Sequence, residues 1–130
     1  MLTIGIKNKE TITVTEENTA KKLGSGLLPV FATPAMVALM ESTASNSVLA
    51  ELAENEGTVG ISLNVKHISA TPVGMSVYCI SELVEIDKKR LVFEVEAYDE
   101  TGLIGQGTHE RFIIDNEKFM AKAEGKKGGV

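Results

Sequence analysis

One long apolar helix, placed before a series of strands, is the feature that most constrains the fold. After Pro34 the chain runs to about residue 53, about five helical turns, without glycine or a further proline, and the first two turns are apolar on nearly all sides. Pro34 suits the first helical position, Thr33 suits the N-cap before it, and Gly57 follows the end. Such a helix is buried on more than one side, so other elements must surround it.

The sequence changes after Gly57 to four strand-like runs. They are rich in β-branched residues and alternate between apolar and polar positions. Residues 87–89 and 100–102 predict hairpin turns between long antiparallel partners. A further strand is predicted before the helix. The five runs are LTIGIKNKETITV, TVGISLNVKHI, GMSVYCISELVEI, RLVFEVEAYDE and LIGQGTHERFIID.

These elements predict the α+β class and, within it, a hotdog fold, in which a curled antiparallel sheet is wrapped around one long central helix. We expect a single hotdog domain over residues 1–120 and a flexible C-terminal tail over residues 121–130. A curled sheet of this kind has a free edge, which the pairing of two chains would cover. The sequence therefore predicts a homodimer or a tetramer.

Composition narrows the partners and the compartment. The net charge of −5 gives no reason to expect a nucleic-acid partner. Cys79 is the single cysteine, so an internal disulfide and a paired-thiolate metal site are excluded, as suits a reducing compartment. The sequence shows no transmembrane run and no signal peptide. We expect a cytoplasmic protein with no membrane partner.

Glu41 is a lone acid at the end of the apolar run of residues 35–40. Burial of a lone carboxylate is costly unless the charge is used or compensated. The positions three and four residues away on either side hold Val, Ala, Ala and Ser, so a local helical ion pair is excluded. Glu41 is therefore either an acid that reaches solvent or a distant lysine, or a catalytic carboxylate.

Three further polar residues are candidates for chemistry. Thr33 has an ordinary role as an N-cap, but the N–H groups at a helix start also suit a developing oxyanion. The alternation of residues 59, 61, 63 and 65 places His67 on the face turned to the helix, as a satisfied core histidine or as a general acid and base. His109 lies beside Glu110 and Arg111, and one of these three is explained by a structural role.

The helix geometry limits how these residues can combine. Thr33 and Glu41 are eight residues apart, which is about 12 Å along a straight helix. They cannot touch within one chain. If both serve one site, two subunits must supply them.

Three segments, VFATPAMVALME, GTVGISLNVKHISATPVG and IGQGTHERFIID, strongly resemble the fluoroacetyl-CoA thioesterase family of hotdog-fold acyl-CoA thioesterases. The resemblance spans residues 11 to 121. It implies that Thr33, Glu41 and His67 form the catalytic set, that the backbone of Gly60 lies against the acyl group, and that Arg111 is near the pocket. One segment departs from the pattern: TAKKLGSGLLPVFATP is short and basic, where the specialised fluoroacetyl-CoA enzyme carries a longer, phenylalanine-rich lid.

The predicted reaction is hydrolysis of a small or medium acyl-CoA thioester, without a metal or cofactor. Glu41 acts either as the nucleophile or as the base that activates water, Thr33 donates a hydrogen bond, and His67 protonates the leaving thiolate. Two alternatives are an acyl-CoA-binding module without catalysis and a hydratase or dehydratase. A hydratase requires a closely spaced Asp–His pair, which this sequence lacks. The expected apolar pocket residues are Val30, Phe31, Met36 and Met40.

Overall fold

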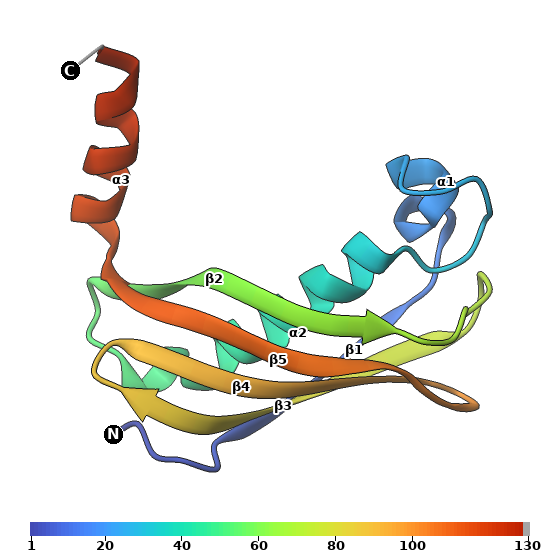
Figure 1. Cartoon of the computed structure of the whole chain (residues 1–130), viewed down its shortest axis with the longest axis horizontal. Helices are drawn as coiled ribbons and strands as arrows, with labels where there is room; N and C mark the ends of the chain where they lie inside the picture. The colour runs from blue at the N-terminus through green and yellow to red at the C-terminus, as the bar shows by residue number, and fades with distance from the viewer. Residues whose placement is uncertain (129–130) are drawn as a thin grey trace.

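The computed structural model describes residues 1–128, in which a five-stranded antiparallel sheet curls around one helix (Figure 1). The strand order in the sheet is β1-β3-β4-β5-β2, so β1 and β2 are the two edges. The predicted hotdog fold and both predicted hairpins are confirmed. The strands are β1 (Lys7–Thr13), β2 (Glu56–His67), β3 (Ser76–Asp87), β4 (Arg90–Asp99) and β5 (Gly102–Asp115).

Helix α2 (Thr33–Val48) lies against the concave face of the sheet and is followed by a 3-10 turn, Leu49–Glu51. Its buried stripe packs on apolar residues of β3, β4 and β5. Ala38 is exposed, so one chain buries a single stripe of the helix rather than several sides as predicted. The buried residues of the stripe are Met36, Leu39, Met40, Thr43, Ala44 and Val48.

The start of α2 differs from the prediction. Ala32 is the N-cap, no side chain caps the helix, and Thr33 is the first helical residue. The N–H of Ala32 donates to the carbonyl of Asn18, and the carbonyl of Ala32 accepts from Met36. The preceding loop therefore holds the helix start through its backbone, and the Thr33 hydroxyl is free for another partner.

A short helical segment precedes α2. It contains a 3-10 turn, Glu16–Asn18, and helix α1 (Ala20–Leu23). The Thr19 hydroxyl caps α1 at its start, and Gly24 ends it with a φ of 78°. Thr19 also bridges to Phe31, so this segment is attached to the chain just before α2.

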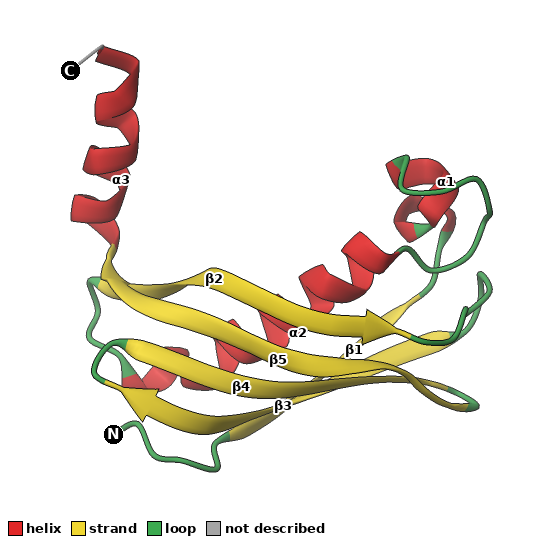
Figure 2. Cartoon of the chain, in the orientation of Figure 1, coloured by secondary structure: helices red, strands yellow, loops and turns green. Residues whose placement is uncertain are grey.

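The C-terminal segment is helical, which the sequence analysis did not predict. Helix α3 (Asn116–Glu124) begins at Asp115, whose side chain accepts from the N–H of Lys118, and a 3-10 turn, Gly125–Gly128, follows. Figure 2 shows α3 standing away from the sheet, and all its side chains are exposed. The expected tail began at residue 121, inside this helix, and its last residues, 129–130, lie outside the described residues.

A buried carboxylate joins the β4–β5 hairpin to the connection between β2 and β3. Asp99 is 7% exposed and accepts hydrogen bonds from the Thr71 hydroxyl at 2.7 Å, from the Thr101 N–H and hydroxyl at 2.8 Å each, and from the Gly102 N–H at 3.2 Å. Burial raises the pKa of Asp99, but these hydrogen bonds outweigh it and leave the pKa below its usual value. The fold therefore stabilises the charged form.

We expect the substitution Asp99→Ala to lower the free energy of unfolding by about 1–3 kcal/mol, because it leaves the buried Thr71 hydroxyl and turn N–H groups without their acceptor. Urea denaturation at neutral pH measures the change. Asp87→Ala in the β3–β4 turn is the matched control, since that side chain is 62% exposed and lies 3.9 Å from Arg90; its effect should stay within about 0.5 kcal/mol. Equal losses in both variants would contradict the role of Asp99.

Candidate active site

A bulge in β2 decides which of its residues face helix α2. The pairing register with β5 shifts between Gly60 and Ser62. A Cβ atom at Gly60 would overlap Oε2 of Glu41, so Gly60 faces the helix, and beyond the bulge Val65 packs on the core. The predicted unbroken alternation over residues 59–67 is therefore wrong at its start, because the extra residue of the bulge turns the two halves of the strand differently.

The first of two polar clusters lies at the start of α2. Thr33 Oγ1 and His67 Nδ1 are 2.8 Å apart, and the ring of Phe31 meets the imidazole edge-on at 6.4 Å between centroids. Burial lowers the pKa of His67, against the opposing effect of the Ser69 backbone. The buried Nε2 of His67 has no hydrogen-bond partner within residues 1–128. A cavity of about 280 Å³ here is lined by Val30, Phe31, Thr33, His67, Ile68, Ser69 and Ala70.

The second cluster surrounds Glu41 in the middle of α2. Arg111 Nη1 donates to Glu41 Oε2 at 3.4 Å, and the same nitrogen lies 3.2 Å from Nε2 of His109. Two further guanidinium donors are held by Thr58, whose hydroxyl accepts from Nε at 2.7 Å and whose carbonyl accepts from Nη2 at 2.9 Å. Gly60 completes the cluster, since its missing side chain leaves room for the carboxylate.

Burial and charge set the state of this cluster. His109 is fully buried and Arg111 is 7% exposed, whereas the Glu41 side chain is 39% exposed. Burial lowers the pKa of His109, the Ser62 carbonyl opposes this shift, and the charge of Arg111 adds to it. Burial also lowers the pKa of Arg111, while the charge of Glu41 works in the other direction. The arrangement therefore holds a charged pair beside a neutral imidazole.

The two clusters lie at different points along β2, one beside Gly60 in its first half and the other beside His67 at its end. Gly60 and His67 are seven residues apart along the strand, which is about 20 Å. Thr33 and Glu41 are separated by about 12 Å along α2. Within one chain, the structure brings Thr33 to His67, and Glu41 to Gly60 and Arg111, but it does not bring Glu41 to Thr33 or to His67.

The expected pocket residues divide in the same way. Phe31 lines the cavity beside His67, but Met36 and Met40 are fully buried members of the core and do not line it. Thr58 is a site residue that the sequence analysis missed. Nothing in its sequence neighbourhood indicated that its hydroxyl and carbonyl hold a guanidinium.

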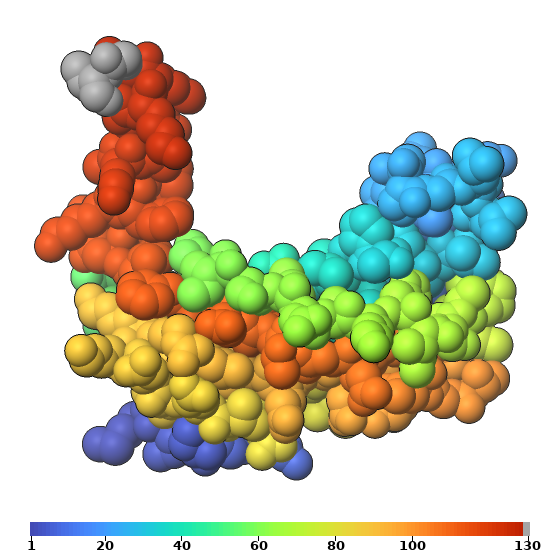
Figure 3. Space-filling view, viewed as in Figure 1, coloured from blue at the N-terminus to red at the C-terminus, as the bar shows by residue number. Residues whose placement is uncertain are grey.

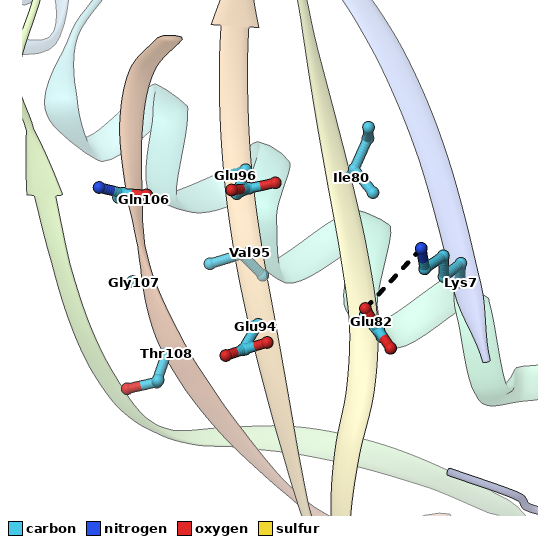
Figure 4. A pocket seen from close by; sticks show the side chains of 9 residues that line it. All are labelled: Lys7, Ile80, Glu82, Glu94, Val95, Glu96, Gln106, Gly107 and Thr108. Atoms are coloured by element: carbon cyan, nitrogen blue, oxygen red, sulfur yellow. Dashed lines mark ion pairs between the residues drawn. The ribbon is translucent and has the colours of Figure 1, made fainter. Parts of the chain in front are cut away.

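Another depression, of about 390 Å³, lies on the outer face of the sheet (Figure 4). Three acidic side chains of β3 and β4 border it, and Lys7 pairs with one of them, Glu82, at 3.8 Å. None of the predicted site residues borders it. Its lining residues are Lys7, Ile80, Glu82, Glu94, Val95, Glu96, Gln106, Gly107 and Thr108.

No group of three or more His, Cys, Asp or Glu side chains within residues 1–128 could hold a metal ion. None of the helices described is both long enough and apolar enough to span a bilayer.

Comparisons with known proteins agree with the geometry. The model of the fluoroacetyl-CoA-specific thioesterase family matches residues 14–117. A fluoroacetyl-CoA thioesterase from Streptantibioticus cattleyicolor is 42% identical over 97 residues, which cover 75% of this chain and 70% of that protein.

Solved structures extend the similarity over almost the whole chain. The fluoroacetyl-CoA thioesterase FlK superposes with a TM-score of 0.92 at 34% identity, covering 97% of this chain and 98% of FlK. A mutant of FlK in complex with acetyl-CoA gives the same TM-score over 96% and 98% of the two chains. A thioesterase superfamily member from Thermus thermophilus gives a TM-score of 0.90 at 30% identity, over 98% of this chain and 95% of that one.

The two histidines of the chain give a testable dependence on pH. We expect NMR titration to place both midpoints below about 6.5, the unfolded value, because burial lowers both folded-state pKa values. The unfolded chain then takes up protons first, so stability present above about pH 6.5 is lost as the pH falls below it. Urea denaturation at about pH 7.5 and about pH 5.5 measures this loss. The variant His67→Gln assigns the two signals, and a midpoint above the unfolded value would contradict the expectation.

Proposed function

The chain belongs to the fluoroacetyl-CoA-specific thioesterase family and is an acyl-CoA thioesterase, and from this premise we propose that its active site is shared between two subunits. The observation that supports the proposal is the division of the polar residues into two half-sites. One half-site contains Thr33 and His67, and the other contains Glu41, Gly60 and Arg111. Each half-site is incomplete for thioester hydrolysis by itself.

Strand β2 offers the surface on which two chains would join. It is an edge strand, so within residues 1–128 one side of its backbone has no strand partner, and Ile61 and Leu63 are 51% and 37% exposed. Figure 3 shows this edge as the floor of a saddle between α3 and α1. An antiparallel pairing of two β2 strands about a two-fold axis near Leu63 and Asn64 would bring the Gly60 end of one beside the His67 end of the other, because the axis lies midway between them.

In the shared site, each side chain has a role that fits its surroundings. Glu41 supplies a carboxylate that either attacks the thioester carbon or removes the proton from the attacking water. Thr33, at the first turn of α2, donates to the carboxylate or to the thioester oxygen, and nearby helix N–H groups stabilise the oxyanion. His67, whose Nε2 has no hydrogen-bond partner among residues 1–128, protonates the departing thiolate of coenzyme A.

A short or medium acyl chain is the substrate we propose. The cavity beside His67 is about 280 Å³ and is bordered by Phe31 and other apolar residues. The FlK complex contains the two-carbon acyl group of acetyl-CoA. The segment before α2 contains a single aromatic residue, Phe31, so we do not propose selectivity for the fluoroacetyl group.

We also propose a cytoplasmic location, because the single cysteine, Cys79, is free and buried.

The variant Glu41→Gln tests the role of the carboxylate. We expect thiol release from acyl-CoAs of increasing chain length to fall by at least about 100-fold, because the amide can neither attack nor accept the proton. The side chain is nearly isosteric and partly exposed, so the melting temperature and the oligomeric state should stay close to wild type. Turnover near the wild-type rate would end the assignment.

Mixed dimers test whether the site is shared. Inactive subunits carrying Glu41→Gln and inactive subunits carrying His67→Ala are unfolded together and refolded at equal amounts. In a shared site, each mixed dimer has one intact site and one doubly altered site, so about a quarter of the wild-type activity should return.

The control for this experiment is each variant refolded alone, which should stay inactive. If both residues acted within one chain, every site in the mixture would carry one defect. The mixture would then be as inactive as the separate variants, and the shared site would be wrong.

A further inference from the structure

The guanidinium of Arg111 has most of its donors occupied by groups other than Glu41. Thr58 holds one edge through its hydroxyl and its carbonyl, at 2.7 Å from Nε and 2.9 Å from Nη2. On the other edge, Nη1 is shared between Glu41 Oε2 at 3.4 Å and His109 Nε2 at 3.2 Å. Glu41 is therefore contacted by a single nitrogen of a guanidinium that is itself tightly fixed.

The chemistry of these neighbours determines the protonation of His109. Its Nδ1 lies 2.9 Å from the carbonyl oxygen of Ser62, which can only accept a hydrogen bond. Its Nε2 faces Nη1 of Arg111, which can only donate. Both contacts are satisfied only by the neutral ring with its proton on Nδ1. His109 thus donates to the bulge of β2 and accepts from Arg111.

From this geometry we propose that His109 is a positioning residue that controls how Arg111 contacts Glu41. Arginine and a free carboxylate usually form a bidentate pair with two parallel hydrogen bonds. Here Thr58 occupies the Nε–Nη2 edge and His109 takes one N–H of Nη1, so that Glu41 is contacted through Nη1 alone. Glu41 keeps a compensating positive charge nearby while its second oxygen remains available. The inference rests on the proposed catalytic role of Glu41.

The location of the contacts supports this assignment. The ring N–H of His109 donates to the carbonyl of Ser62. Ser62 is the residue at which the pairing register of β2 shifts. Gly60 lies on the other side of the same shift, and a Cβ there would be 3.2 Å from His109 Cε1 and 3.3 Å from Arg111 Nη1. The imidazole therefore lies between the bulge that brings Gly60 to the carboxylate and the guanidinium that holds it.

Two substitutions separate the two hydrogen bonds of the ring. In His109→Gln, the side-chain oxygen can reach the place of Nε2 and accept from Arg111, but the contact with Ser62 is lost. In His109→Asn, the shorter amide can donate to Ser62 from the place of Nδ1, but Arg111 loses its acceptor. Each variant keeps one of the two polar contacts. If the ring positions Arg111, the variant that keeps the Arg111 contact should be the more active, whereas a purely structural role predicts no such difference.

We expect His109→Asn to reduce kcat for acyl-CoA hydrolysis by about 10- to 100-fold, the value of a hydrogen bond to a charged group, with little change in KM. His109→Gln should retain most of kcat, even if its melting temperature falls as much as that of His109→Asn. Val77→Ala, a core substitution in β3 away from both clusters, is the control for loss of stability and should leave kcat unchanged. Equal kcat values in the two His109 variants, or a more active Asn variant, would overturn the proposal.

Nitrogen-15 NMR gives a test that needs no activity assay, and the variant His67→Gln distinguishes the signals of the two histidines. We expect the signals of His109 at neutral pH to show a protonated Nδ1 and an unprotonated Nε2. The opposite tautomer or a doubly protonated ring would overturn the proposal. This measurement does not depend on the role of Glu41. An active Glu41→Gln variant would contradict the proposed function, whereas the His109 tautomer tests the hydrogen bonds of the ring alone.

Discussion

The rotation of α2 about its own axis is the constraint from which the rest of the site follows. Met36, Leu39, Met40 and Ala44 are buried against the sheet, and this stripe fixes which way every other residue of the helix points. On the opposite border, Ser42 and Asn46 donate to Glu10 of β1 at 2.6 and 2.7 Å. With both borders fixed, Glu41 is turned away from β1 toward the β5–β2 side of the sheet, where Gly60 and Arg111 lie.

The bulge in β2 and the arginine of β5 solve the problem of placing a charged pair close to the core. A guanidinium that is 7% exposed is costly unless its donors are satisfied, and here two acceptors on Thr58, one on His109 and one on Glu41 engage four of its five N–H groups. The shift in register brings the residue without a side chain to the helix at the point where the carboxylate needs space. Backbone geometry and charge compensation thus support each other.

The sequence predicted the parts of this arrangement that depend on periodicity. The five strands, the central helix, the lone acid at position 41 and the place of His67 on the helix-facing side follow from patterns of two and of three to four residues. It did not predict the start of α2, because that end is held by backbone contacts of Ala32 rather than by a capping side chain. The bulge was missed because the apolar alternation of residues 59, 61, 63 and 65 continues through it in the sequence, although the bulge reverses which residues face the helix. The helix over residues 116–124 was missed because its polar composition gave no buried face to detect, and it is exposed along its length.

The distance between the two half-sites separates folding from activity in this protein. Each half-site forms within one chain: Thr33 has its contact with His67, and Arg111 is held by Thr58, His109 and Glu41. Folding of one chain therefore does not require the acid and the imidazole to meet, and the roughly 20 Å of β2 between them keeps them apart. In the proposed dimer, the same edge strand that separates them in one chain would join them between two chains. A substitution at the exposed β2 edge would then reduce hydrolysis without disturbing either half-site, because it would act on assembly alone.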